Sequence, residues 1–288
     1  MTAGWNTSTH FANAQAMGAS TATSSGVTLT SGASNVKGAW SQVIASTASD
    51  ITHLLVCFSY FSAGGGGGNG PGGAIDVAVA PSGSEASGIL IQNLIVPMLV
   101  VFGEHFLLPV GQIPAGSRIA ARFASSFASD TVALSLVGFD SGWSSASNGG
   151  LWDTYGWSGS GAIQGFAVDP GATINVKGSY VALSTSVTND LSGFFITWDV
   201  QNRASSTGSY MDYLVDFALG GIGSEVVILP NVMIARNSFT GGVLYGPQTT
   251  PFLPIPIAAG SRLSCRAQAY NVTALDRILG VSVYGLRA

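Results

Sequence analysis

The sequence predicts an all-β protein made of two tandem β-sandwich domains of the jelly-roll type, arising from an internal duplication. Three observations support this prediction. Short runs rich in β-branched and aromatic residues alternate with clusters of Gly, Ser, Pro and Asn, as in sandwich proteins. No segment has a sustained 3.6-residue apolar period. A set of motifs returns about 140 residues further along, which places one domain in 1–140 and the other in 141–288.

The repeat consists of blocks that occur in the same order in both halves. The spacing between the two copies changes only between blocks, where insertions fall in loops. A duplicated unit explains this order better than chance does. The clearest matches are NVKG at Asn35–Gly38 and Asn175–Gly178, GSE at Gly83–Glu85 and Gly223–Glu225, and AGSR starting at Ala115 and Ala259.

Each half is expected to contain about eight short strands, the number in a jelly roll. Alternation along the third strand places Leu54, Val56 and Phe58 toward the core, with His53 and Cys57 on the other face. In the first half the predicted strands are Val27–Thr30, Trp40–Ile44, His53–Phe61, Ala74–Val79, Gly88–Leu94, Glu104–Pro109, Arg118–Ser125 and Val132–Phe139.

A segment rich in Gly, Ser and aromatic residues precedes each predicted sandwich as an arm. The second arm contains Trp143, Trp152 and Trp157. A segment with three tryptophans is expected to pack on a domain or a partner rather than extend into water. The same rings are candidate contacts for a glycan, because aromatic faces stack on sugars.

The chain carries few charges for its size. Charged residues make up 8% of the 288 residues and hydrophobic residues 47%, whereas an average soluble domain has roughly 25% charged residues. Lysine occurs only at Lys37 and Lys177. Such a surface is typical of a protein covered by other subunits. The composition favours an assembly subunit, and we expect a homo-oligomer, with a trimer as the favoured state.

Several classes of partner are not expected. A net charge of −4 with few basic residues offers no electrostatic footprint for nucleic acid. The N-terminal residues lack the basic and apolar regions of a signal peptide. The most hydrophobic stretch, Gly88–Gly103, is too short to span a bilayer. We therefore expect neither a nucleic-acid nor a membrane partner.

No motif indicates a catalytic site, a cofactor or a metal, and the chain is predicted not to be an enzyme. The run Ala63–Gly73 lacks the Lys-Ser/Thr of a phosphate-binding loop, and no Gly-x-Ser-x-Gly elbow occurs. Cys57 is expected on an outer face and Cys265 in a core, which argues against a disulfide between them. The histidines are scattered and unmatched between the halves, which makes them poor metal ligands; they are His10, His53 and His105.

The rare charges recur at equivalent positions in both halves, which indicates a repeated structural task. Pairing across strands or at turn caps is the main interpretation. Calcium binding, a repeated pair of catalytic carboxylates and contacts between subunits stay open as alternatives. The matched pairs are Lys37/Lys177, Arg118/Arg262, Arg122/Arg266, Asp50/Asp190, Asp76/Asp216 and Glu85/Glu225.

The repeated blocks also resemble a known family. GAWSQVIAST (Gly38–Thr47), AIDVAVAPSGSE (Ala74–Glu85) and IPAGSRIAAR (Ile113–Arg122), with second copies at Tyr213–Glu225 and Ile257–Arg266, are similar to a family of tailed-bacteriophage virion proteins. The resemblance covers both repeats and nearly the whole chain. It implies a virion structural protein of the duplicated, jelly-roll-like decoration, collar or fibre type.

The leading hypothesis is a virion structural protein of a tailed phage, assembled in the host cytoplasm and placed on the particle exterior. Head decoration, neck or collar, and tail or fibre are the candidate positions, and other virion proteins are the expected partners. An alternative is a carbohydrate-binding or receptor-binding module that contacts a host surface glycan through Trp143, Trp152 and Trp157. A polysaccharide depolymerase ranks third, because no carboxylate pair for glycoside hydrolysis is apparent.

Overall fold

The computed structural model describes most of the chain. The described residues form antiparallel strands and a short 3-10 helix, η2 (Glu85–Ser87). His10, Trp143 and residues 63–72 of the Gly-rich run lie outside them. The described ranges are 14–20, 25–62, 73–96, 104–125, 127–140, 151–158, 164–200, 210–237, 248–269 and 278–288.

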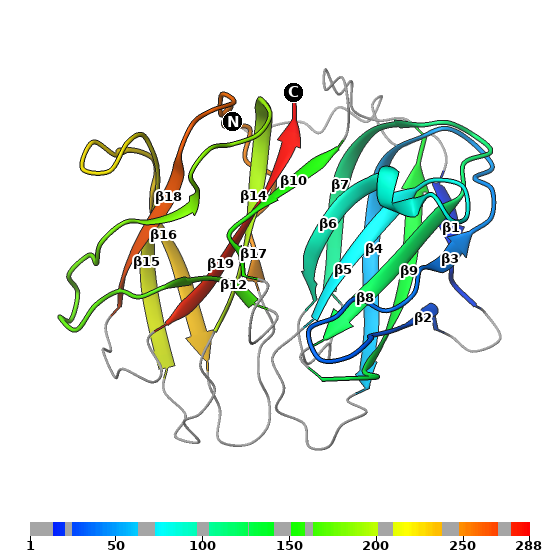
Figure 1. The fold of residues 1–288 in the computed structure, drawn as a ribbon, viewed down its shortest axis with the longest axis horizontal. Helices are drawn as coiled ribbons and strands as arrows, with labels where there is room; N and C mark the ends of the chain where they lie inside the picture. Colours follow the sequence, from blue (N-terminus) through cyan, green and yellow to red (C-terminus); the bar gives the residue numbers. More distant parts are fainter. Residues whose placement is uncertain are drawn as a thin grey trace, which may run out of the picture.

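The first half forms two sheets that face each other (Figure 1). One has the order β1–β9–β4–β7, with β2 also paired to β9, and the other has the order β3–β8–β5–β6. The strands are β1 (Ala14–Met17), β2 (Val27–Thr30), β3 (Ser41–Ile44), β4 (Ile51–Ser62), β5 (Gly73–Val79), β6 (Ile89–Val96), β7 (Glu104–Ile113), β8 (Ile119–Ser125) and β9 (Thr131–Phe139).

The second half repeats this arrangement. One sheet has the order β11–β12–β19–β14–β17, with β10 also paired to β19, and the other has the order β13–β18–β15–β16. The strands are β10 (Trp152–Tyr155), β11 (Trp157–Ser158), β12 (Gln164–Val168), β13 (Val181–Ser184), β14 (Leu191–Val200), β15 (Tyr210–Leu219), β16 (Val226–Asn237), β17 (Gln248–Thr249), β18 (Leu263–Ala269) and β19 (Leu279–Arg287).

Both halves therefore have the strand order of a jelly roll. The set β2–β9–β4–β7 faces β3–β8–β5–β6, and β12–β19–β14–β17 faces β13–β18–β15–β16. The predicted all-β sandwich class is confirmed. The expected boundary at residue 140 borders the undescribed stretch 141–150, and a duplication as the origin of the two halves remains an inference from the sequence.

The arms contribute the strands β1 and β10, which the alternation pattern did not predict, whereas β2 lies at the predicted position Val27–Thr30. β1 and β2 follow each other along one edge of β9, and β10 and β12 do the same along β19. A glycine in the left-handed region ends the first strand of each pair, Gly18 with φ +74° and Gly156 with φ +76°. Glycine adopts this conformation without strain, and a Cβ at Gly156 would lie 2.6 Å from the Val281 carbonyl oxygen.

The side chains predicted to point inward form the two cores. Leu54 and Val56 are fully buried and Phe58 is 1% exposed, and their counterparts Phe194 and Ile196 are also buried. The third counterpart, Trp198, lies in the core of the second half. Period-two alternation therefore assigned the faces of β4 and β14 correctly.

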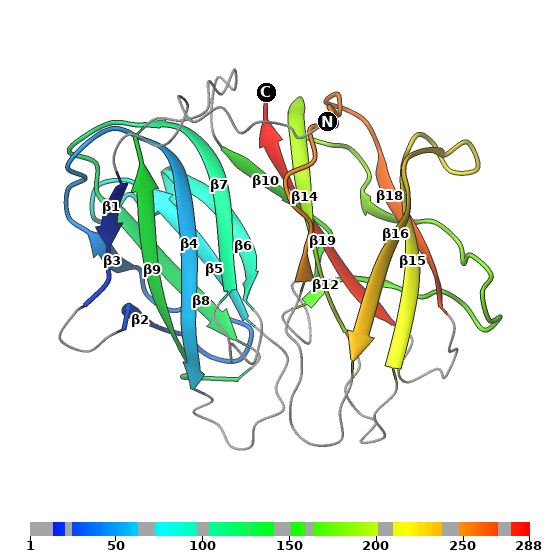
Figure 2. The ribbon, with the colours of Figure 1, turned by 180° about the vertical axis from the view of Figure 1, so that it is seen from behind.

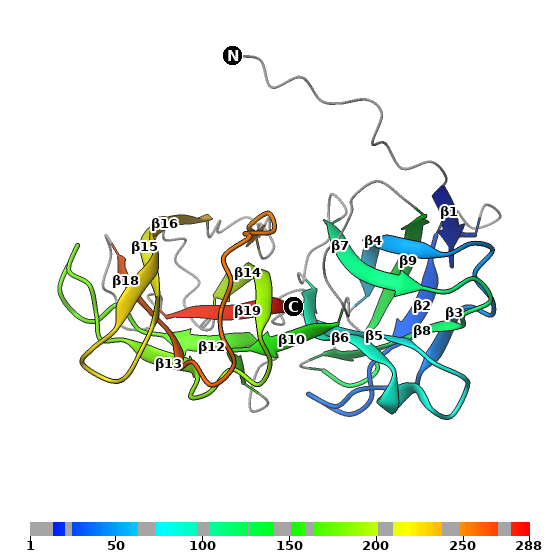
Figure 3. The same cartoon turned by 90° about the horizontal axis from the view of Figure 1, so that it is seen from above.

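The two sandwiches lie side by side, with β6 and β10 at their junction (Figures 1 and 2). Seen from above, β10 of the second half lies next to β6 of the first half (Figure 3). The C-terminus lies beside this junction. Among the described elements, no helix has the length and apolar character needed to cross a membrane.

Candidate functional site

The repeated charges of the first half meet around the buried carboxylate of Asp76. Lys37 Nζ lies 2.9 Å from Asp76 Oδ1, and Arg122 Nε lies 2.8 Å from Oδ2. The backbone N–H of Asn93 donates a third hydrogen bond to Oδ1 at 2.8 Å. Each partner comes from a different part of the sheet, so the carboxylate joins β5, β6, β8 and the segment before β3.

The second half contains the same cluster around Asp216. Lys177 Nζ lies 2.8 Å from Oδ1, Arg266 Nε lies 3.0 Å from Oδ2, and the Asn231 N–H donates to Oδ1 at 2.9 Å. Asn93 and Asn231 both adopt the left-handed conformation, with φ 55° and 53°. The asparagines therefore turn their N–H groups toward the carboxylates in the same way in both halves.

An aromatic ring covers one cation of each cluster. The Arg122 guanidinium lies 4.5 Å from the centre of the Trp40 ring, and the Arg266 guanidinium lies 4.5 Å from the centre of the Tyr180 ring. Such a contact holds the planar guanidinium in place while its Nε bonds the carboxylate.

A second ion pair closes the turn after β5 and after β15. Arg118 Nη1 bonds Glu85 at 2.8 Å, and Arg262 Nη1 bonds Glu225 at 3.0 Å. The two glutamates each accept a hydrogen bond from the backbone N–H two residues earlier, at 2.9 Å. The GSE motif is therefore a turn whose glutamate anchors the arginine that immediately precedes the neighbouring strand.

The matched pair Asp50 and Asp190 caps another turn. Asp50 accepts from the Ala115 N–H at 2.8 Å, and Asp190 accepts from the Ala259 N–H at 2.7 Å. The structure thus brings every matched charge into a structural contact, and the ion pairs and backbone hydrogen bonds of these charges are equivalent in the two halves.

Burial and pairing shift several pKa values in these clusters. Burial lowers the pKa of Lys37 to about 8, although the Asp76 carboxylate acts in the opposite direction. Burial also acts to raise the pKa of Asp216, but hydrogen bonds from Lys177, Asn231 and Arg266 outweigh it and hold the pKa below its usual value. These carboxylates are engaged as acceptors, which suits a structural role.

The contact between the sandwiches is the most aromatic part of the described structure. On the second half, the outer face of the β10–β19–β14 sheet carries Trp152, Phe195 and Tyr284, all at most 4% exposed. The Phe195 and Tyr284 rings stack at 4.7 Å, and Trp152 meets Phe195 edge-on at 5.2 Å. Phe106 of the first half lies 6.1 Å from Phe195, which joins this face to the first core.

Hydrogen bonds fix the same contact. The Tyr284 hydroxyl donates to the Asn93 carbonyl at 2.6 Å and accepts from the Ile95 N–H at 3.0 Å. Burial raises the pKa of Tyr284, so the hydroxyl stays protonated and can donate. Trp152 Nε1 donates to the Pro109 carbonyl at 2.9 Å. The outer face of one sandwich thereby satisfies backbone groups along the edge of the other.

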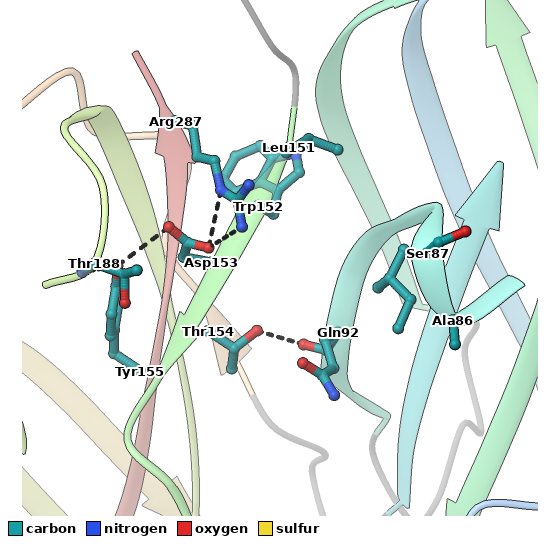
Figure 4. Close-up of a pocket in the computed structure, with 11 residues that line it drawn as sticks. Ala86, Ser87, Gln92, Leu151, Trp152, Asp153, Thr154, Tyr155, Thr188 and Arg287 are labelled. Carbon is teal, nitrogen blue, oxygen red and sulfur yellow. Dashed lines mark hydrogen bonds and ion pairs between the residues drawn. The ribbon is translucent and has the colours of Figure 1, made fainter.

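An open groove of about 390 Å³ lies beside this contact (Figure 4). Asp153 at its centre is bonded by Arg287 at 2.6 and 3.0 Å and by Asn189 Nδ2 at 2.8 Å. The Thr154 hydroxyl donates to the Gln92 carbonyl across the groove. Burial and the Asp153 charge raise the pKa of Tyr155 to about 12. The groove is polar, and its one lining carboxylate is already ion-paired.

Two of the arm tryptophans pack on the domains, as expected for a segment with three tryptophans, so they are not open rings for stacking on a sugar. Trp152 is 4% exposed, with its ring packed against Phe195 and Phe252. Trp157 packs against Ala74 and Ala124 of the first sandwich. Both rings fill contacts within the chain because the arm lies between the halves. Trp143 lies outside the described residues, so its expected role stays a prediction.

The cysteines and His53 differ in burial. His53 is buried and the side chain of Cys265 lies in a core, while Cys57 is partly exposed, and both cysteines are free thiols. Within the described ranges, no three His, Cys, Asp or Glu side chains gather closely enough to hold a metal ion. The sequence reasoning missed the aromatic face of Phe195 and Tyr284. A comparison of outward positions between the halves could have found it, because Leu55 and Val137 stand there in the first half.

Comparisons with known proteins give faint likenesses. No protein-family model and no curated protein sequence matches the chain. Among solved structures, PNGF-II is 9% identical with a TM-score of 0.36, and the match covers 91% of this chain and 65% of that one. The tandem CBM22-1–CBM22-2 domain of Paenibacillus barcinonensis Xyn10C is 10% identical over 86% of this chain and 83% of its own, with a TM-score of 0.21.

The T=1 particles derived from infectious bursal virus give 10% identity over 96% of this chain and 74% of theirs, with a TM-score of 0.15. The chain spans 65% of the length of the PNGF-II structure, the first of these matches. At TM-scores below 0.5, these likenesses carry no argument about function.

Proposed function

We propose that the chain is a structural subunit on the exterior of a tailed-phage particle, acting through contacts with its own copies and with other virion proteins. The observation that carries the proposal is the apolar edge strand β16. Val226 is 67% exposed and Met233 72% exposed, and Ile222 in the preceding turn is 88% exposed. An exposed apolar edge is a pairing and docking surface. Burial in an assembly would remove it from water.

Two further features support this role. The resemblance of the repeated blocks is to virion proteins, and it covers both halves. The ion-pair clusters around Asp76 and Asp216 lock each sandwich without leaving their carboxylates open for chemistry. Rigid domains with few surface charges suit a particle component. The proposal therefore includes no catalytic step.

Immunogold labelling tests the proposal directly. An antibody raised against the purified chain should label density-purified phage particles at one position, the head surface, the neck or the tail. Mass spectrometry of the same particles should detect the chain in a fixed ratio to other virion proteins. Preimmune serum provides the control. If purified particles contain none of the chain, the proposal is wrong.

The groove beside the junction favours a second candidate function, binding of a glycan. Its lining offers hydroxyl, amide and charged groups from Gln92, Thr154 and Arg287, which are the groups that hydrogen-bond sugars. Binding on a glycan array that is lost in Gln92→Ala would support it, and an array without signal would exclude it. Glycan cleavage is not favoured, because Asp153 is the one carboxylate among the lining residues and hydrolysis uses two.

A further inference from the structure

The contact between the two sandwiches joins two unlike surfaces, and the chain carries a second example of each. The first sandwich contributes its edge at β6 and β7. The second contributes the outer face of β10, β19 and β14. Because the halves share one strand order, the second sandwich has a corresponding edge at β16, and the first has a corresponding face on β1, β9, β4 and β7.

We call the stretch Val226–Ile234 the β16 edge, and its most exposed large hydrophobic side chain is Met233. Asn93 and Asn231 share the left-handed conformation and donate to equivalent aspartates. Two residues further on, Ile95 and Met233 therefore occupy equivalent places. Ile95 is fully buried under the second sandwich, whereas Met233 is 72% exposed. The β16 edge therefore presents to solvent the kind of surface that the β6 edge buries against the second sandwich.

We call the row Leu107, Leu55, Val137 and Ala16 the Leu107 face. These residues lie directly opposite one another across β7, β4, β9 and β1, so they share one face of the sheet. Leu107 is 43% exposed, Leu55 and Val137 are partly exposed, and Ala16 is exposed. In the second sandwich, the corresponding row is Phe195, Tyr284 and Thr154.

We propose that a second copy of this chain docks its β16 edge on the Leu107 face, repeating between chains the contact that joins the two sandwiches within a chain. This inference rests on the proposed function and names the partner for its main contact. The interface is head to tail, because each copy contributes a different surface. Repetition then gives a ring if the rotation closes and a filament if it does not.

The side chains on the two surfaces match in size and character. The large rings of Phe195 and Tyr284 are replaced on the Leu107 face by the smaller Leu55 and Val137. The edge compensates, because the long, flexible Met233 stands where the shorter Ile95 stands in the first half. Neither the β16 edge nor the Leu107 face contains a charged residue, so no charge has to be desolvated.

The contact between chains should be weaker than the contact within a chain. Tyr284 bonds the Asn93 carbonyl and the Ile95 N–H, and its counterpart Val137 has no hydroxyl to do so. The second copy is also held by no covalent link. A reversible association that depends on protein concentration is the expected behaviour.

Sedimentation velocity on the full chain tests this inference. The wild type should form species larger than a monomer as its concentration rises through the micromolar range. Met233→Asp should weaken this association by at least about tenfold, since it places a charge at the position whose equivalent in the first half, Ile95, is fully buried. Val176→Asp is the matched control, because Val176 is 51% exposed and precedes β13, at the opposite edge of the same sheet from β16.

Mixing two variants tests the head-to-tail geometry. Leu107→Asp places a charge on the Leu107 face and leaves the β16 edge intact, and Met233→Asp does the reverse. Each variant alone should stay monomeric, and an equimolar mixture should form dimers and nothing larger. A symmetric contact would not be rescued by mixing. Circular dichroism of each variant checks that it is folded.

Disulfide trapping gives a second readout that does not need a destabilising charge. In a Cys57→Ser background, the pair Val137→Cys and Met233→Cys should cross-link between chains, and the pair Val176→Cys and Val137→Cys should not. A monomeric wild type, an unaffected Met233→Asp or a mixture that stays monomeric would each overturn the inference. Particle labelling still decides the proposed function in those cases, so the two can fail separately.

Discussion

Strands β6 and β16 occupy the same place in their sandwiches, yet their surroundings differ completely. Ile95 and Asn93 on β6 are 0% and 9% exposed, while Met233 on β16 is 72% exposed and Asn231 is also exposed. Both strands hold the same hydrogen bond to a buried aspartate. The burial of an edge strand therefore depends on the surface that packs against it. The cluster around the buried aspartate is the same in both halves, although the exposure of the strand above it differs.

The equivalent outer faces of the two sandwiches also differ in how far they are covered. The face of the second sandwich, which is covered within the chain, carries Trp152, Phe195 and Tyr284. The equivalent face of the first sandwich has Ala14, Leu55 and Val137 at those positions. Large aromatic side chains lie on the face that is covered within the chain, and smaller aliphatic side chains lie on the face that is exposed or partly exposed.

The largest expected effect tests whether the burial of β6 against the second sandwich strengthens the ion-pair cluster around Asp76. Asp76→Ala leaves the half-buried cations Lys37 and Arg122 without their carboxylate and should cost about 3–5 kcal/mol of unfolding free energy. Asp216→Ala should cost less, because Arg266 is 33% exposed against 25% for Arg122. Urea unfolding measures both. Equal costs would mean that the cover has no influence on the cluster.

A smaller effect is expected at the hydrogen bonds between the halves. Tyr284→Phe keeps the ring but leaves the Ile95 N–H and the Asn93 carbonyl buried without this partner, at a cost of about 1–3 kcal/mol. Tyr180→Phe is the control, since its ring stacks on Arg266 whether or not the hydroxyl is present. Thermal unfolding compares the two. A neutral Tyr284→Phe would show that the hydroxyl does not secure the junction.

The cation–aromatic contacts provide a finer comparison. Trp40→Leu removes the ring over Arg122 and should cost about 0.5–1 kcal/mol. Tyr180→Leu should cost slightly less, because tryptophan is the stronger partner of a cation. The same urea titrations measure these values. A larger loss at Tyr180 would contradict the expected order.

The smallest expected effect is a difference in acid sensitivity. The folded pKa of Asp216 is lowered, so its stabilising contribution is complete above the unfolded pKa of about 4 and is lost as the pH falls through the folded value. Wild-type melting temperature should therefore decline below about pH 4. Asp216→Asn should show a shallower decline between pH 5 and pH 2.5, and identical slopes would count against this assignment.

The sequence by itself determined the class of fold, the position of most strands and the positions at which charges matter. Period-two alternation is a local property, so Leu54, Val56 and Phe58 could be assigned to the core without any partner. The repeated blocks marked Asp76 and Asp216 as equivalent, because the same local cluster is built twice.

Only the tertiary structure decided which groups meet. Asp76 collects cations from two other segments and an N–H from β6, and alternation does not specify such partners. It likewise placed Trp152 inside a junction rather than on a surface. Ile95 and Met233 look alike in sequence, but one is covered by a sheet from almost 190 positions away and the other is open. Burial at an edge is a property of the body that packs against it, which the edge's own residues do not encode.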